Sequence, residues 1–138
     1  MKNDEWRDKY IIGITEIDDD HQHLFDVIAM EVSELILNKD KVQTYFSTKN
    51  IDDLLTKIKQ HYHNEELWMK GHQYPHIEKH QEQHSNSVEE IEKVAALIEN
   101  RDFSKWISFY LMVLENLDGH VLEYDKKIGE YYQELGFQ

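Results

Sequence analysis

The chain has 138 residues, a length that suits one domain with a single sizeable core. Its 15 Lys and Arg residues against 28 Asp and Glu residues give a formal net charge of -13, which argues against a nucleic-acid partner because phosphates need clustered basic side chains. It contains no cysteine, which excludes disulfides, thiolate metal ligands and thiol catalysis.

No segment resembles a signal peptide or a membrane span. The first residues, Met1–Glu5, are mostly polar, and the longest apolar run, Trp106–Leu114, is interrupted by Ser108 and far too short to cross a bilayer. We therefore expect one soluble domain over residues 1–138, cytoplasmic and without a membrane partner. The sequence leaves the oligomeric state open and slightly favours a monomer.

Four stretches with the apolar spacing of amphipathic helices follow one another, separated by short polar breaks. The first runs from Ile17 to Ile36. The second begins before Tyr45 and stops near Gly71, a plausible C-terminal glycine. The third starts near Pro75, where the fixed φ suits a first turn, and runs to Ile98. The fourth follows Asp102, a candidate N-cap, and extends through Trp106 to Tyr131.

This pattern predicts an all-α fold. Four helices of this length with short connections favour an up-down-up-down antiparallel four-helix bundle. We expect the bundle to occupy residues 17–135 and residues 1–16, with Trp6 and Tyr10, to form an N-terminal arm packed across it.

Polar residues stand at positions that the apolar spacing assigns to the interior: His21, His61, Glu65, His80, His84 and His120. Burying an unpaired polar group costs roughly 1–3 kcal/mol, so six of them are hard to fold around unless something satisfies them together. A metal does so, because it takes neutral imidazole and ionised carboxylate as ligands. The sequence therefore predicts a metal centre inside the bundle.

The spacing of these residues supports a shared centre. His61 and Glu65 are four residues apart, as are His80 and His84, which puts each pair on one helix face. Asp125, a further candidate, follows His120 by five residues, about 140° around an ideal helix. The two can share a site only if one side chain reaches round, or if the helix is locally overwound or bulged. Two bridging carboxylates, five imidazoles and one oxo or hydroxo bridge would leave one position open on two six-coordinate ions.

Four motifs occur in order along nearly the whole chain: Trp6-x3-Tyr10-x2-Gly13-x3-Ile17-Asp18-x2-His21-x2-Leu24-Phe25, His61-x3-Glu65-Glu66-x2-Met69, Tyr74-Pro75-x4-His80-x3-His84 and His120-x4-Asp125. Together they resemble the bacterial hemerythrins. The resemblance implies a non-haem centre of two iron ions (Fe²⁺/Fe³⁺) with an oxo or hydroxo bridge, which binds dioxygen reversibly, with nitric oxide as a further candidate ligand.

The resemblance also implies a role for each metal ligand. One iron is expected on His80, His84 and His120 and the other on two imidazoles, with two carboxylates bridging them: His21, His61, Glu65 and Asp125. Dioxygen would bind the iron that has only two imidazoles. Resemblance and helical spacing together place five residues around that position: Leu24, Tyr62, Leu117, Val121 and Ile128.

Two positions depart from the family pattern. Asn116 stands where a tryptophan is usual, and Tyr62 where a phenylalanine is usual. Both put polar groups near the expected ligand pocket, which predicts faster autoxidation than in a fully apolar pocket.

Other polar residues are interpreted as surface groups. We expect His23, His63, His72 and His76 to be exposed, and Glu66 to be either solvated or in contact with a metal ligand. The acidic run 18–20 is most simply a helix N-terminus.

Several functions remain open at this point. We expect an O2-binding protein for storage, delivery or scavenging rather than an enzyme. The alternatives are an O2 or redox sensor module and a di-iron nitric oxide or peroxide reductase. A carboxylate-rich oxidase is disfavoured because no Glu is followed three residues later by His. A zinc or nickel store is disfavoured because the candidate ligands lie on the core stripe.

Overall fold

A computed structural model describes residues 10–38, 48–98 and 103–136. Four long helices make up most of this part of the chain: α2 (Thr15–Leu37), α4 (Thr48–Gly71), α5 (Ile77–Ala95) and α6 (Phe103–His120). A short wide turn, η2 (Val121–Asp125), and helix α7 (Lys126–Glu134) continue α6. Within these ranges there is no strand, and no helix is long and apolar enough to cross a membrane.

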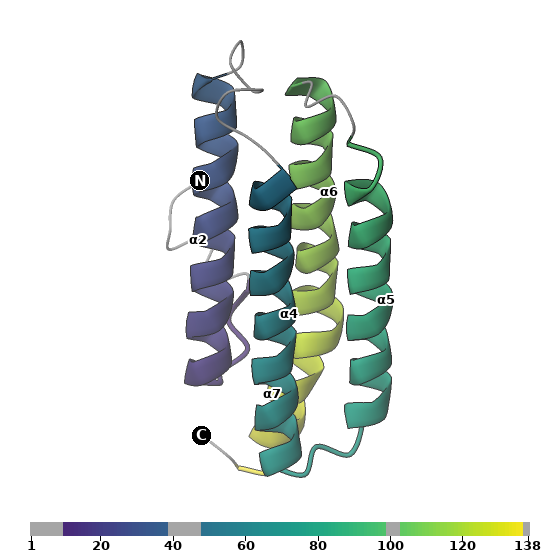
Figure 1. Cartoon of the computed structure of the whole chain (residues 1–138). Helices are drawn as coiled ribbons and strands as arrows, with labels where there is room; N and C mark the ends of the chain where they lie inside the picture. The colour runs from purple at the N-terminus through teal and green to yellow at the C-terminus, as the bar shows by residue number, and fades with distance from the viewer. Residues whose placement is uncertain (1–9, 39–47, 99–102, 137–138) are drawn as a thin grey trace.

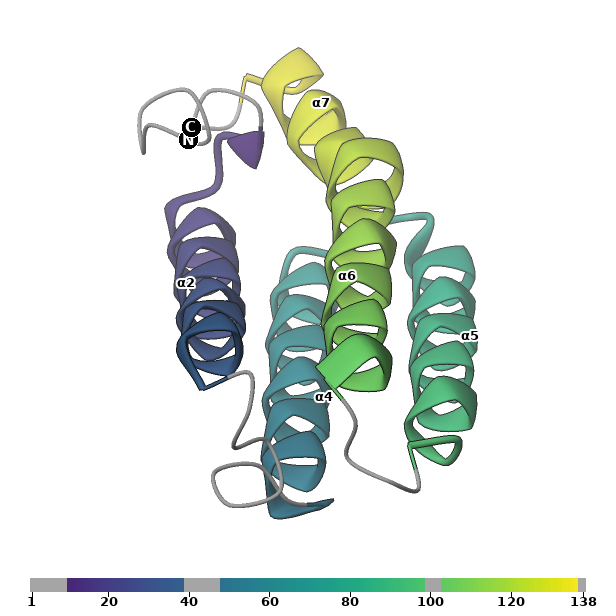
Figure 2. The ribbon, with the colours of Figure 1, turned by 90° about the horizontal axis from the view of Figure 1, so that it is seen from above.

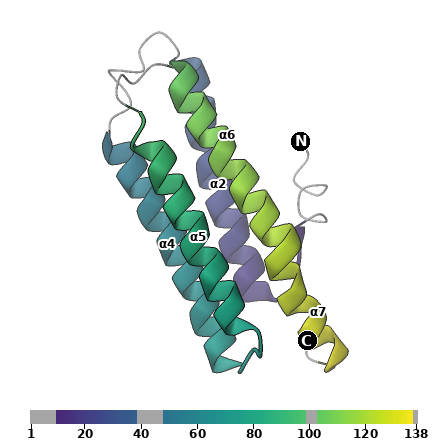
Figure 3. The same cartoon turned by 90° about the vertical axis from the view of Figure 1, so that its right-hand side faces the viewer.

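The long helices run alternately up and down, so that neighbours in the sequence are antiparallel (Figure 1). Helix α2 packs against α4 and α6, and α5 packs against the same two helices. In the view from above, α2 and α5 lie on opposite sides of α4 and α6 (Figure 2). Helix α7 carries the line of α6 beyond the end of the bundle (Figure 3). The predicted all-α, up-down-up-down bundle is confirmed.

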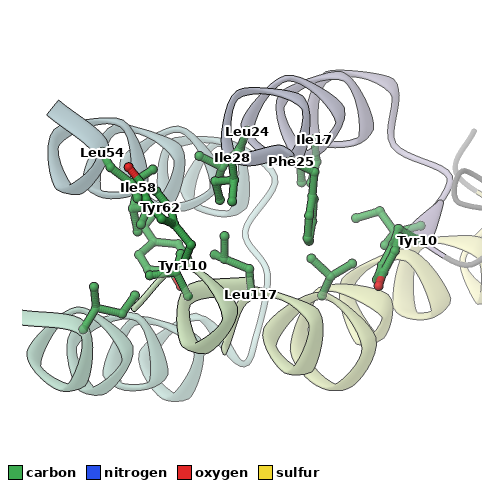
Figure 4. Close-up of a cluster of buried hydrophobic side chains, with 14 of the residues drawn as sticks. Tyr10, Ile17, Leu24, Phe25, Ile28, Leu54, Ile58, Tyr62, Tyr110 and Leu117 are labelled. Carbon is green, nitrogen blue, oxygen red and sulfur yellow. The ribbon is translucent and has the colours of Figure 1, made fainter. Parts of the chain in front are cut away.

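The interior changes character along the bundle axis. Towards one end it is apolar and aromatic, with fully buried side chains from three helices, including Leu54, Ile58, Ile91, Trp106 and Tyr110. Leu24, Ile28 and Leu117 face one another further along the same interior (Figure 4). Helix α5 buries only His80, His84, Ser87 and Ile91, so its inward face is mostly polar. Buried apolar side chains, including Ile17, Met69 and Ile128, also lie beyond the histidines, so the polar groups are enclosed within an apolar core.

Helix α4 ends at Gly71, where the sequence predicted its end, and is followed by a Schellman motif. The residue with a left-handed backbone is Gln73, at φ 56°, and not Gly71, which is still helical. The Tyr74 N–H donates to the Met69 carbonyl oxygen at 2.9 Å, and both side chains are buried. This hydrogen bond and the burial of the two side chains offset the roughly 1–2 kcal/mol that a left-handed backbone costs a residue other than glycine. Helix α5 begins at Ile77, after this turn.

The arm is described from Tyr10 onwards, and Trp6 lies outside the described residues. The Tyr10 ring stacks on Phe25, with ring centroids 5.1 Å apart, and the Tyr10 hydroxyl donates to the Asp118 carboxylate. Ile12 is buried against α7, where its carbonyl oxygen would lie 2.0 Å from a Cβ built on Gly129. A glycine at this position is therefore what lets the arm lie on the bundle.

Candidate metal centre

The bundle gathers the seven candidate ligands at one place in its interior. They come from every long helix and from η2, and none is more than 3% exposed: His21, His61, Glu65, His80, His84, His120 and Asp125. The structure thus brings together all of the residues that the sequence picked out as ligands. Seven polar residues this deeply buried need partners, because water cannot supply them.

Glu65 lies between two groups of imidazoles. Its Oε2 is 2.8 Å from Nε2 of His21 and 2.8 Å from Nε2 of His61. Its Oε1 lies 3.0–3.2 Å from the Nε2 atoms of the other three imidazoles, His80, His84 and His120. One carboxylate therefore presents one oxygen to a pair of imidazoles and the other oxygen to a set of three.

Asp125 repeats this division. Its Oδ2 is 2.7 Å from Nε2 of His21, and its Oδ1 is 2.9 Å from Nε2 of both His80 and His120. Two clusters with metal-ligand composition result, and both contain Glu65 and Asp125. In each cluster the donor atoms lie within 4.8 Å of one another. The arrangement is that of two neighbouring cation sites that share two carboxylates.

The wide turn η2 is what brings Asp125 inward. The Lys126 N–H donates to the Val121 carbonyl oxygen five residues back, which is a π-helical hydrogen bond. A π turn advances less than 100° per residue, so the helix is underwound here. Of the three alternatives that the sequence left open, the structure therefore shows the bulged helix and not the overwound one. The extra residue also shifts the buried face of α7 from Tyr131 to Tyr132.

Three imidazoles have their outer nitrogen engaged by an acceptor. His61 Nδ1 donates to Asp20 Oδ2 at 2.7 Å, and His84 Nδ1 donates to Glu66 Oε2 at 2.7 Å. His120 Nδ1 donates to the side-chain oxygen of Gln83. In their neutral form these rings carry their proton on Nδ1, so each turns a lone pair on Nε2 towards the centre.

These lone pairs meet carboxylate oxygens, which are also acceptors. His61 Nε2 is 2.8 Å from Glu65 Oε2, and His120 Nε2 is 3.1 Å from Glu65 Oε1. Two acceptors at such distances repel each other unless a cation lies between them. Imidazole nitrogen and carboxylate oxygen together are the donors of choice for first-row metal ions, so the residues fit a metal.

Without a metal, protons take the place of that cation. Burial lowers the pKa of His21, but its hydrogen bonds with Asp125 and Glu65, together with their charges, raise this pKa to about 10. For His61 and His120, the carboxylates likewise outweigh burial and raise the pKa to about 9. Burial raises the pKa of Glu65, but the charges of the imidazoles hold it well below its ordinary value. The carboxylates thus stay ionised, and protons and metal ions compete for the same nitrogens.

The six residues expected around a ligand pocket lie within one helical turn of the candidate ligands. Leu24, Leu117, Val121 and Ile128 are buried in the core, and Leu24 and Leu117 are visible in Figure 4. The Tyr62 ring stacks on His84 with centroids 4.0 Å apart. Asn116 is half-buried and accepts a hydrogen bond from Ser87. The part that these six play towards a ligand stays a prediction.

Sequence reasoning missed several partners of the ligands. Asp20 was taken as part of a helix N-terminus, but it accepts a hydrogen bond from His61. In the same acidic run, Asp18 accepts hydrogen bonds from the backbone N–H groups of Ile12 and Gly13 and so anchors the arm. Glu66, expected either in solvent or beside a ligand, proves to bind His84. Pairs between different helices leave no spacing signal in one sequence, which is why Gln83 and Ser87 were also missed.

The remaining histidines behave as expected. Their side chains are exposed, and none of them belongs to the two buried clusters: His23, His63, His72 and His76. His76, four residues before His80, lies in the turn before α5. Although His76 has the same four-residue spacing to His80 as His80 has to His84, it does not reach the buried clusters.

The fold and site define a class, the helical bundles that bury a histidine-rich cation site around shared carboxylates. The family model "Hemerythrin HHE cation binding domain" matches residues 12–132. The chain therefore belongs to the hemerythrin family, in which the bound metal is iron.

The chain is similar to curated relatives over most of its length. It is 28% identical over 127 residues to a bacteriohemerythrin of Clostridium acetobutylicum, a match that covers 88% of this chain and 95% of the relative. It is 31% identical over 119 residues to a bacteriohemerythrin of Campylobacter jejuni, covering 83% of this chain and 86% of the relative. No solved structure matches the chain significantly.

Proposed function

We propose that this protein holds two iron ions and uses them to bind dioxygen reversibly. The observation that carries the proposal is the division of both buried carboxylates between two groups of imidazoles. Glu65 turns one oxygen to a pair of imidazoles and the other to a set of three, and Asp125 turns one oxygen to His21 and the other to His80 and His120. Glu65 and Asp125 would bridge the two ions. His21 and His61 would hold one ion, and three imidazoles the other: His80, His84 and His120. An oxo or hydroxo group is the proposed third bridge.

The unequal numbers of imidazoles support a ligand position on one of the two ions. The ion on His21 and His61 has one protein donor fewer, so the open position belongs to it. Two ferrous ions can supply one electron each to dioxygen, which is the chemistry that the bound metal contributes.

The surrounding side chains would protect this position from water. Leu24, Leu117, Val121 and Ile128 are all nearly or fully buried, and they form an apolar, low-dielectric wall beside the cluster. Tyr62 adds an aromatic ring to the wall, with its hydroxyl hydrogen-bonded to Ser87 at 2.8 Å. Because this hydroxyl is already paired, Tyr62 can line the site without offering it a free polar group.

Binding rather than catalysis is the proposed role. Five of the seven proposed ligands are neutral imidazoles and only two are carboxylates. Such a ligand set suits reversible binding of dioxygen better than the formation of high-valent iron. A sensor would use the same binding step, and nitric oxide would use the same open position. A cytoplasmic location and a monomeric state remain predictions from the sequence.

Metal analysis and visible spectroscopy test the proposal directly. We expect about two iron ions per chain, no visible band after anaerobic reduction, and a charge-transfer band that forms with dioxygen and fades under argon. His61→Ala should lose the band and part of the iron. His63→Ala, two residues away and exposed, is the matched control and should keep both. A colourless protein that holds zinc, or a band that does not fade, would overturn the proposal.

A further inference from the structure

Two carboxylates outside the seven candidate ligands each contact one of the imidazoles. Asp20 Oδ2 is 2.7 Å from His61 Nδ1, and Glu66 Oε2 is 2.7 Å from His84 Nδ1. His61 belongs to the cluster with two imidazoles and His84 to the cluster with three. Each half of the centre therefore has its own outer carboxylate, at the same distance.

Both outer carboxylates sit at the boundary between core and solvent. The Asp20 side chain is 27% exposed and the Glu66 side chain 29%, whereas the imidazoles that they contact are 3% exposed. Asp20 reaches from α2 to α4, and Glu66 reaches from α4 to α5. Water therefore reaches one side of each carboxylate, while the other side faces an imidazole inside the core.

A carboxylate that accepts a hydrogen bond from the outer nitrogen of an imidazole changes how strongly the inner nitrogen binds a metal. It fixes the proton on Nδ1, orients the ring and makes Nε2 a stronger donor to a metal. His120 has the side-chain oxygen of Gln83 in the same place, which accepts the hydrogen bond but carries no charge. In each half of the centre, one imidazole thus donates to a carboxylate, and a third imidazole, His120, donates to a neutral amide oxygen.

We propose that Asp20 and Glu66 are positioning residues that separately set the metal affinity and reduction potential of the two halves. Asp20 would act through His61 on the half with the open position, and Glu66 through His84 on the other. The inference rests on the proposed function, because it needs two metal ions on the two clusters.

Zinc binding to the metal-free protein measures the effect on affinity without any redox chemistry. Asp20→Asn and Glu66→Gln keep an oxygen that accepts the Nδ1 proton and remove only the charge. Each should weaken one of two zinc-binding steps by about 10- to 100-fold and leave the other step unchanged. Asp19→Asn and Glu82→Gln remove the same charge at exposed neighbouring positions and should leave both steps unchanged.

The reduction potential separates tuning from a purely structural role. In the iron-loaded protein, Asp20→Asn should raise the potential, because removing a negative charge disfavours the ferric state. Gln83→Glu adds a charge behind His120 and should lower the potential. Two zinc ions bound with unchanged affinity in Asp20→Asn and Glu66→Gln would overturn this inference alone. A parent protein that binds fewer than two zinc ions would overturn the pair of cation sites on which the proposed function rests.

Discussion

Gly129→Ala is the substitution with the largest expected effect on how the arm docks. A Cβ at position 129 would lie 2.0 Å from the carbonyl oxygen of Ile12 and 3.0 Å from its carbonyl carbon. These atoms belong to the backbone, so no side-chain rotation relieves the clash and the arm must lift from α7. Lifting uncovers Ile12, which is 5% exposed, at a cost of about 1.5–3 kcal/mol.

The substitution Gly129→Ala also has a stabilising effect on the helix itself, and a matched control variant measures this effect. Alanine is better than glycine inside a helix by about 1 kcal/mol, so Gly129→Ala should lose a net 0.5–2 kcal/mol, roughly. Gly119→Ala makes the same replacement in α6, where a new Cβ meets no atom within 4 Å. It should stabilise the protein by about 1 kcal/mol. The two variants should therefore differ by about 1.5–3 kcal/mol.

Urea unfolding of the metal-free protein, followed by circular dichroism, measures this difference. Metal must be absent, since a bound ion would stabilise the folded state by mass action and mask the arm. Both variants should show the slope of the parent protein, so that midpoints report stability. If Gly129→Ala were as stable as Gly119→Ala, the close packing of the arm on α7 would be refuted.

Two other expectations concern the centre. Asn116 lines a cavity of about 420 Å³ that also reaches His120, so Asn116→Trp should fill it and slow the decay of the oxygenated form; an unchanged decay rate contradicts this. In the metal-free protein, the pKa values of His21, His61 and His120 are raised to about 9–10, above the ordinary 6.5. The stability that these imidazoles add is full below pH 6.5 and lost as the pH rises through 9–10. Urea midpoints of the metal-free protein should therefore fall over that range, and midpoints that stay level would show that the imidazoles are not protonated there.

The sequence predicted the helices and the candidate ligands because both depend on spacing along one helix. Residues three and four apart share a face, so polar residues on an apolar stripe stand out without any knowledge of the fold. Glu65 and His84 are of this kind. That they lie close to His21 could be predicted only because four helices with short connections must share one interior.

What escaped prediction depends on contacts between helices or on local backbone geometry. The hydrogen bond between Asp20 and His61 joins α2 to α4, and the spacing of residues within either helix does not predict it. Gly71 is the last residue of α4, as predicted, but the left-handed backbone that closes the helix falls on Gln73, next to the buried Tyr74. Packing decided the turn against local preference.

The extra residue in η2 also governs the far end of the molecule. If residues 121–125 were wound as a regular α-helix with every residue kept, Asp125 would lie about 140° around the helix from His120, and α7 would turn with it. That rotation would swing Asp125 away from the histidines and, in the same movement, carry Gly129 out from under Ile12. Docking of the arm and closure of the cation sites thus both depend on the same wide turn.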